Sequence, residues 1–361
     1  MLSLTHPELP TKPHATGATA LADGRTIGWA GFGDPEGDAV FWFHGSPGAR
    51  CQIPDDLDAE ASARRLRVIG VERPGTGDSS PHDYDQVVGF VPDLVAVADD
   101  LGVDQFAAAG LSGGGPFVLA CASQLPERMT AGMVLGGMGP TRGTDAVISY
   151  TLGLIPLAPA IDAVRGPLSS AFAAVIRAMG PVGGPLVHAF FQFEVGDSTQ
   201  MHAKPDTKHQ LVADLSDASH RSGLGAGLGD LVLFGRHWGF ELGDIAVPIT
   251  FWAGTSDVIV PYVHAERQWK RVSGSHLRTM EGRGHFAGYT EVGDVLEEIR
   301  RLWPPVRPVT TTSSATRTRK KKASKKKATA KSGQKKSAAS KTAKTGKTTQ
   351  TAKTTKKAAK G

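Results

Sequence analysis

Short apolar runs recur along the chain, and each has the length of a β-strand. They lie at residues 39–43, 67–71, 106–109, 133–135, 249–253 and 277–280. Between several of them, apolar residues fall three or four positions apart, as they do on one face of a helix. This spacing predicts helices over 91–101 and 292–302, the second with Thr290 as its N-cap. Strands that alternate with helices predict the α/β class, with a mostly parallel sheet covered by helices on both faces.

The alternation lapses between about residues 140 and 244, where Gly, Pro, Ala and Leu are frequent. Because long loops without regular structure are uncommon in compact domains, 140–244 is predicted to be an inserted helical lid. Further surface helices of the core are the alternative. The predicted core is then 19–139 together with 245–306, and an N-terminal extension, 1–18, precedes it.

The end of the chain has a different composition from the rest. Thr311 to Gly361 contains 18 of the 41 Lys and Arg residues and no Asp or Glu, which leaves 23 basic against 35 acidic residues elsewhere. No large apolar side chain is present there, so nothing offsets the entropy of ordering, and 307–361 is predicted to be disordered. This Lys/Ala-rich segment resembles the tails of linker histones. The resemblance implies binding to DNA, RNA or another polyanion through phosphates, without base recognition. A solubilising tail is the alternative.

The sequence offers no targeting or metal-binding pattern. Residues 1–18 lack a charged start followed by an apolar run, and no apolar stretch reaches the roughly 20 residues of a membrane-spanning helix. A cytoplasmic location is therefore expected, with association to the nucleoid through the tail. The only cysteines, Cys51 and Cys121, have no metal-ligand spacing and are too few for a disulfide framework. We expect two reduced thiols, no metal and no cofactor.

The first chemical signal directly follows the strand 106–109. The next five residues match the G-x-S-x-G pattern, in which small flanking residues allow a sharp turn that exposes the serine hydroxyl. A helix is predicted after them, with Pro116 tolerated in its first turn. The pattern predicts a nucleophile elbow formed by Gly110, Leu111, Ser112, Gly113 and Gly114, with Ser112 as the nucleophile.

A second signal, the segment His-Gly-Ser-Pro-Gly at 44–48, follows the apolar strand 39–43. A tight loop in this place can direct a backbone amide outward. Pro47 has no N–H, so the amide of Ser46 is the best donor. Together with the amide of Gly113 it would form the two-donor oxyanion hole that acyl transfer needs. An ordinary Gly-Pro turn is the alternative.

Two further loops supply an acid and a base. Asp257 follows the apolar strand 249–253, and His285 lies between glycines and the final helix. A serine hydroxyl needs a histidine to remove its proton, and that histidine needs an acid that orients it. Ser112, Asp257 and His285 also occur in the chain order expected of a hydrolase with this elbow. They are predicted to form a catalytic triad.

These motifs resemble the α/β-hydrolase superfamily, in its branch of lidded esterases, lipases and peptidases, over residues of about 20 to 304. The resemblance includes the loop 73–79, Arg-Pro-Gly-Thr-Gly-Asp-Ser, where Glu72 replaces the usual Asp; we interpret this loop as structural. The resemblance implies a cofactor-free hydrolase that cleaves a small-molecule acyl substrate through an acyl-enzyme, most simply a carboxylic ester.

Several other functions remain open. A proline iminopeptidase usually has Trp after the nucleophile, where Gly113 stands here, and the lid has no obvious acidic cluster for an amine. A perhydrolase or haloperoxidase would use the same triad, and a non-catalytic module tethered to nucleic acid by the tail is the alternative from another class. Substrate is expected to contact Leu111, Trp238 and Phe286, together with lid residues Leu152, Leu154, Ile155, Leu157, Phe172, Val175, Phe190 and Phe191.

Overall fold

The structure is a computed structural model of the chain, and it describes residues 8–147, 203–222 and 225–303. The chain divides into two units, Met1–Val306 and Arg307–Gly361. All the described residues belong to the first unit. The predicted tail, and the stretch 148–202 of the predicted lid, therefore lie outside the described residues.

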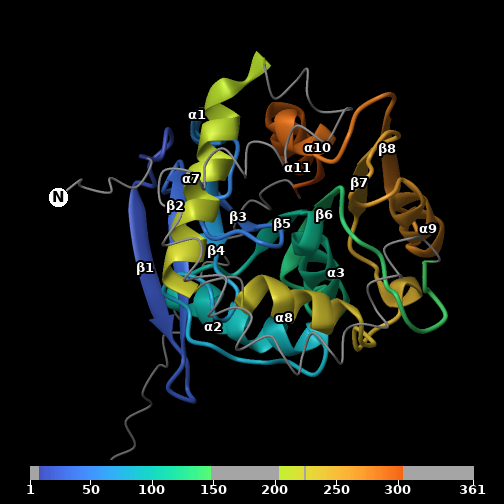
Figure 1. The fold of residues 1–361 in the computed structure, drawn as a ribbon, viewed down its shortest axis with the longest axis horizontal. Helices are drawn as coiled ribbons and strands as arrows, with labels where there is room; N and C mark the ends of the chain where they lie inside the picture. The colour runs from blue at the N-terminus through green and yellow to red at the C-terminus, as the bar shows by residue number, and fades with distance from the viewer. Residues whose placement is uncertain (1–7, 148–202, 223–224, 304–361) are drawn as a thin grey trace, which may run out of the picture. The chain divides into compact units, whose positions relative to one another are not determined.

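Within the described residues, eight strands form one sheet in the order β1-β2-β4-β3-β5-β6-β7-β8 (Figure 1). β1 pairs antiparallel with β2 and β2 antiparallel with β4, and the other neighbours are all parallel. The strands are β1 (Ala15–Ala20), β2 (Thr26–Gly33), β3 (Asp38–Phe43), β4 (Leu66–Val71), β5 (Phe106–Leu111), β6 (Met129–Leu135), β7 (Ile249–Gly254) and β8 (His276–Met280). The predicted α/β class with a mostly parallel sheet is confirmed.

The central strands are apolar at successive positions because both of their faces are buried. In β3, Phe41 and Phe43 belong to one core cluster, whereas Val40 and Trp42 belong to the other. Successive side chains of a strand point to opposite faces, so these two clusters lie on opposite sides of the sheet.

Helices supply the other half of each cluster. Leu94 of α2 and Phe117 of α3 pack in the cluster of Phe41, and Leu57 of α1 and Ile299 of α11 pack in the cluster of Trp42. The α-helices are α1 (Leu57–Ala63), α2 (Val91–Asp100), α3 (Gly115–Gln124), α7 (Pro205–Ser222), α8 (Gly225–Phe234), α9 (Val263–Arg271), α10 (Ala287–Thr290) and α11 (Val292–Leu302). Among these helices, none has the length and hydropathy that crossing a membrane requires.

The two predicted helices are present, but the predicted cap of the second is wrong. Residue Glu291, not Thr290, is the N-cap of α11. Thr290 ends the preceding helix, and its hydroxyl donates backwards to the carbonyl oxygen of Phe286 at 3.1 Å. The hydroxyl of Thr290 therefore bonds within the short helix α10, which the apolar spacing does not predict.

The described part of the predicted lid is anchored to the core through α7. Gln210 donates to the carbonyl oxygen of Cys51 at 3.0 Å, and the ammonium group of Lys204 lies 2.8 Å from a carboxylate oxygen of Asp56. These contacts attach α7 to the segment that follows β3. This segment begins with the loop 44–48, which is predicted to supply one oxyanion donor and is called the oxyanion loop below. Hydrogen bonds therefore connect α7 to the same stretch of chain as this loop.

Candidate active site

The predicted elbow lies between β5 and α3. Ser112 has a φ of +53°, which is the left-handed region that residues with a side chain seldom occupy. A Cβ at Gly110 would lie 2.6 Å from the backbone of Gly114, and a Cβ at Gly114 would lie 2.2 Å from the carbonyl oxygen of Phe43. Both positions require glycine because the turn brings backbone against backbone. Such a sharp, strained turn is what the G-x-S-x-G pattern predicts.

Asp257 and His285 form a buried pair. Nδ1 of His285 lies 2.8 Å from Oδ2 of Asp257, and the two residues are 4% and 7% exposed. The other carboxylate oxygen accepts from the backbone amides of Ile259 at 2.9 Å and Val260 at 2.7 Å. Three hydrogen bonds thus fix the carboxylate. With Nδ1 protonated toward Asp257, Nε2 is the nitrogen that can accept a proton.

The turn after β6 lies against both Ser112 and His285. A Cβ at Gly136 would lie 3.3 Å from Nδ1 of His285, and a Cβ at Gly137 would lie 3.6 Å from the carbonyl oxygen of Ser112. Two consecutive glycines therefore lie next to two of the three members of the predicted triad. The side chain of Ser112 makes no hydrogen bond in the described part of the chain, so its contact with His285 stays a prediction.

The loop after β3 packs directly on the elbow. A Cβ at Gly45 would lie 3.5 Å from Cβ of Ser112, and a Cβ at Gly113 would lie 2.3 Å from Oγ of Ser46. The backbone amide of Ser46 has no acceptor within the described residues. The two predicted oxyanion donors are therefore on adjacent segments.

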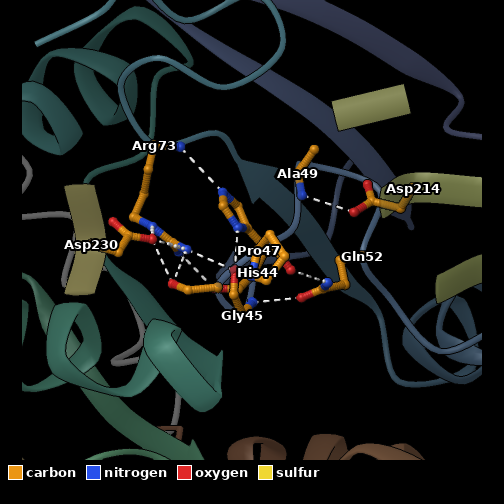
Figure 2. Close-up of polar contacts among 9 residues, drawn as sticks. His44, Gly45, Pro47, Ala49, Gln52, Arg73, Asp214 and Asp230 are labelled. Carbon is orange, nitrogen blue, oxygen red and sulfur yellow. Dashed lines mark hydrogen bonds and ion pairs between the residues drawn. The ribbon is translucent and has the colours of Figure 1, made fainter. Parts of the chain in front are cut away.

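Buried side chains hold this loop from both of its ends (Figure 2). Gln52 accepts from the amide of Gly45 and donates from its amide nitrogen to the carbonyl oxygen of Pro47, the second at 3.0 Å. Asp214 of α7 accepts from the amides of Ala49 at 2.8 Å and Cys51 at 3.0 Å. Sequence patterns did not indicate Gln52 or Asp214, because each acts through a tertiary contact that no local motif encodes.

Glu72 braces the loop 73–79, which agrees with the interpretation of this loop as structural. Its carboxylate accepts from the amide of Asp78 at 2.7 Å and lies 3.3 Å from Nε of Arg50. A Cβ at Gly77 would lie 2.0 Å from this carboxylate. The longer acidic side chain therefore fills the space that Gly77 leaves.

The three predicted substrate contacts in the described part of the chain are core residues. Leu111, Trp238 and Phe286 are 2%, 2% and 6% exposed. The rings of Phe286 and His285 form a T-shaped pair with 5.3 Å between centroids, and Trp238 packs on Phe240. Their contact with substrate stays a prediction, and the predicted lid contacts from Leu152 to Phe191 lie outside the described residues.

Within residues 8–147, 203–222 and 225–303, no group of three or more His, Cys, Asp or Glu side chains could hold a metal ion. The residues near the elbow instead offer a hydroxyl, an imidazole paired with a carboxylate, and the backbone amide of Ser46, which has no acceptor among the described residues. This set can perform acyl transfer to a serine.

Comparison with known proteins gives the family. A model of the alpha/beta hydrolase fold matches residues 38–292, and the chain belongs to this family.

Individual relatives are distant. The chain is 27% identical to a proline iminopeptidase of Arabidopsis thaliana over 159 residues, which cover 42% of this chain and 40% of that protein, so the match spans less than half of the relative. It is 24% identical to an uncharacterized protein of Mycobacterium tuberculosis over 259 residues, 68% of this chain and 70% of that one.

Solved structures share the fold. The esterase RhEst1 from Rhodococcus sp. ECU1013 has a TM-score of 0.59 at 19% identity and covers 79% of this chain and 98% of its own. A bromoperoxidase from Bacillus anthracis has a TM-score of 0.58 at 16% identity, with 80% and 99% covered. At these identities the likeness is one of fold.

Proposed function

We propose that the protein is a serine hydrolase that cleaves a carboxylic ester through an acyl-enzyme. The observation that supports the proposal is the buried pair of His285 and Asp257, together with a serine held at positive φ on the elbow. An esterase is the simplest enzyme that such a set supports without a cofactor.

In the proposed reaction, Oγ of Ser112 attacks the ester carbonyl while Nε2 of His285 takes its proton. Asp257 stabilises the imidazolium, and the amides of Ser46 and Gly113 donate to the oxyanion. Collapse of the tetrahedral intermediate breaks the bond to the alkoxy oxygen, which leaves with the proton from His285. Water then attacks the acyl-enzyme with His285 again as the base, and the acid and free Ser112 are released.

Hydrolysis of short p-nitrophenyl esters and labelling by a fluorophosphonate test the proposal on the full chain. Ser112→Ala is expected to abolish both. Ser123→Ala on the following helix is the matched control, because this hydroxyl bonds only to neighbours on its own helix, donating to the carbonyl oxygen of Ala120 at 2.9 Å and accepting from Gln124 at 3.1 Å. Equal turnover by the Ser112→Ala and wild-type proteins would exclude the mechanism. A folded wild-type protein that resists labelling and turnover would favour the non-catalytic binding module instead.

Proline iminopeptidase activity is the second candidate, and the relative in Arabidopsis thaliana favours it. An aminopeptidase needs an acidic group that is available to the substrate amine. The inserted helices do bring Asp214 and Asp230 to the oxyanion loop, but two backbone amides engage Asp214 and Arg73 engages Asp230. We therefore expect turnover of p-nitrophenyl butyrate to exceed that of proline p-nitroanilide. The reverse ranking would establish the peptidase.

A perhydrolase or haloperoxidase would use the same residues, and the bromoperoxidase neighbour shares the fold. Peracid formation from acetate and hydrogen peroxide, measured against ester hydrolysis, separates these activities.

For the Lys-rich tail we propose binding to polyanions, with the protein in the cytoplasm. The 18 cations of Thr311 to Gly361 support this, because phosphate neutralisation releases counterions. Retention on DNA is expected to be lost when the chain is truncated after Pro308 and to fall steeply with salt. Equal retention of the full and truncated chains would leave the tail as a solubilising segment.

A further inference from the structure

Arg73 is a buried cation that contacts the whole first half of the oxyanion loop (Figure 2). It is 3% exposed, and its guanidinium donates to the carbonyl oxygen of His44 at 2.6 Å, to that of Gly45 at 2.7 Å and to Oγ of Ser46 at 2.8 Å. A guanidinium presents its donors in a rigid plane, so it can hold several acceptors in one fixed arrangement.

Asp230 of α8 neutralises this cation. One oxygen of its carboxylate lies 3.0 Å from Nε and 2.8 Å from Nη2 of Arg73, and the same oxygen accepts from the hydroxyl of Ser46. A buried charge is tolerated when it is paired and hydrogen-bonded. The inserted helix α8 thus supplies the anion that allows Arg73 to remain charged under the loop.

His44 contributes a second donor to the carbonyl oxygen of Gly45. Burial, and then the positive charge of Arg73, hold the pKa of His44 well below its ordinary value, so the ring is neutral. Its Nε2 accepts from the backbone amide of Arg73 at 3.3 Å, and its Nδ1 donates to the carbonyl oxygen of Gly45 at 2.8 Å. Only this tautomer satisfies both partners, because an amide donates and a carbonyl accepts.

The carbonyl oxygen of Gly45 and the amide of Ser46 belong to one trans peptide unit. In such a unit the C=O and the N–H point in opposite directions. Two donors, from Arg73 and His44, fix the direction of this C=O bond. The N–H of Ser46 consequently points in the opposite direction, and no group of the described chain accepts its hydrogen bond.

We infer that Arg73 and Asp230 are positioning residues that orient the amide of Ser46 for the oxyanion of the reaction. The inference rests on the proposed function. It goes beyond that function in assigning part of the catalytic geometry to the inserted segment, through the carboxylate of Asp230.

The test compares Arg73→Met and Asp230→Asn with wild type in the full chain. An oxyanion donor acts in the transition state, so Arg73→Met is expected to lower kcat by about 100-fold with KM unchanged within about threefold. Its affinity for a trifluoromethyl ketone, whose adduct with serine resembles the tetrahedral intermediate, is expected to fall by a similar factor. Arg73→Lys is expected to recover part of kcat, because an ammonium group can still donate to one of the carbonyls.

Arg25→Met is the matched control. Both terminal nitrogens of Arg25 donate to the carboxylate of Asp93, and the distance from Nη2 to Oδ1 is 2.9 Å. The side chains of Arg25 and Asp93 are 17% and 9% exposed. Its loss is expected to lower the urea midpoint while kcat and the ketone affinity stay at wild-type values. A purely structural role of Arg73 would give this same result.

Each outcome decides between the possibilities. A folded Arg73→Met protein with wild-type kcat and ketone affinity would overturn the inference. If that variant does not fold, the isosteric variant Asp230→Asn provides the test. Its kcat is expected to fall by about 10-fold, and an unchanged kcat would overturn the inference. Failure of the proposed function is read separately, on the wild type, as absence of both ester turnover and fluorophosphonate labelling.

Discussion

A Cβ atom at Gly113 would lie 2.3 Å from Oγ of Ser46 and 3.2 Å from the ring of Phe234. The residue after the proposed nucleophile therefore has no room for a side chain, because the oxyanion loop and α8 occupy the space. This contact accounts for glycine at this position.

Gly113→Ala is expected to lower kcat for ester hydrolysis by about 10- to 100-fold, because the new methyl group displaces Ser46 and with it an oxyanion donor. Steady-state kinetics and the rate of fluorophosphonate labelling measure the effect. Gly243→Ala is the control, since a Cβ there meets nothing within 4 Å. An unchanged labelling rate in Gly113→Ala would show that the loop 44–48 can move aside without loss of activity.

Asp257→Asn is expected to lower kcat by on the order of 10³- to 10⁴-fold, because an amide cannot stabilise the imidazolium or select its tautomer. The fold should persist, since the remaining amide oxygen can still accept from Ile259 and Val260. Asp244→Asn, an exposed carboxylate outside the site, is the comparison. Wild-type kcat in Asp257→Asn would remove Asp257 from the mechanism.

The stability of the protein is expected to decrease in mild acid through His264. Burial, partly opposed by Asp257, lowers its pKa to about 4, and its Nδ1 accepts from the amide of Gly139 at 3.0 Å. Between about pH 6.5 and 4 this histidine is protonated in the unfolded chain but neutral in the folded chain. The free energy of unfolding therefore decreases as pH falls through this range.

For one histidine the loss between pH 7.5 and 5.5 is about 1.4 kcal/mol. Urea unfolding at both pH values measures it. In His264→Gln, whose side-chain oxygen can also accept from Gly139, the pH dependence is expected to shrink by this amount. An identical pH dependence in the two proteins would contradict the assignment. His44 contributes in the same direction, because its pKa is lowered too.

The two thiols are expected to react with an aromatic disulfide reagent only on unfolding. Cys121 is fully buried in α3, and burial raises its pKa, so the reactive thiolate is scarce. Cys51 is 8% exposed. Reaction in guanidinium chloride should release two equivalents of product, and rapid reaction of the native protein would show that one thiol is accessible.

The sequence predicts features that depend on local pattern. The run 39–43 is apolar at each position because β3 is buried on both faces, and such a run is visible without any knowledge of its partners. The elbow at Ser112 is likewise local, since its glycines are neighbours in the chain. The pairing of Asp257 with His285 follows from the rule that both lie at the carboxyl ends of adjacent parallel strands.

Contacts between distant segments are what the sequence did not predict. Arg73 and Asp230 are 157 positions apart, and no spacing rule relates a loop after β4 to a helix of the insertion. The interpretation of the loop 73–79 as structural agrees with the contact between Glu72 and Gly77. It does not account for the contact of Arg73 with the oxyanion loop. Thr290 was assigned to the wrong helix end for a similar reason, because its hydroxyl bonds to the residues before it.

The insertion leaves the sheet after β6 and returns at β7, and these two strands are direct neighbours. Register between them is set by backbone pairs such as Leu135 with Trp252, whatever length of chain intervenes. A segment in this place can therefore be exchanged without altering the pairing of β6 with β7. For this chain any replacement must keep two carboxylates, at the positions of Asp214 and Asp230, because the loop after β3 would otherwise lose the hydrogen bonds that anchor it.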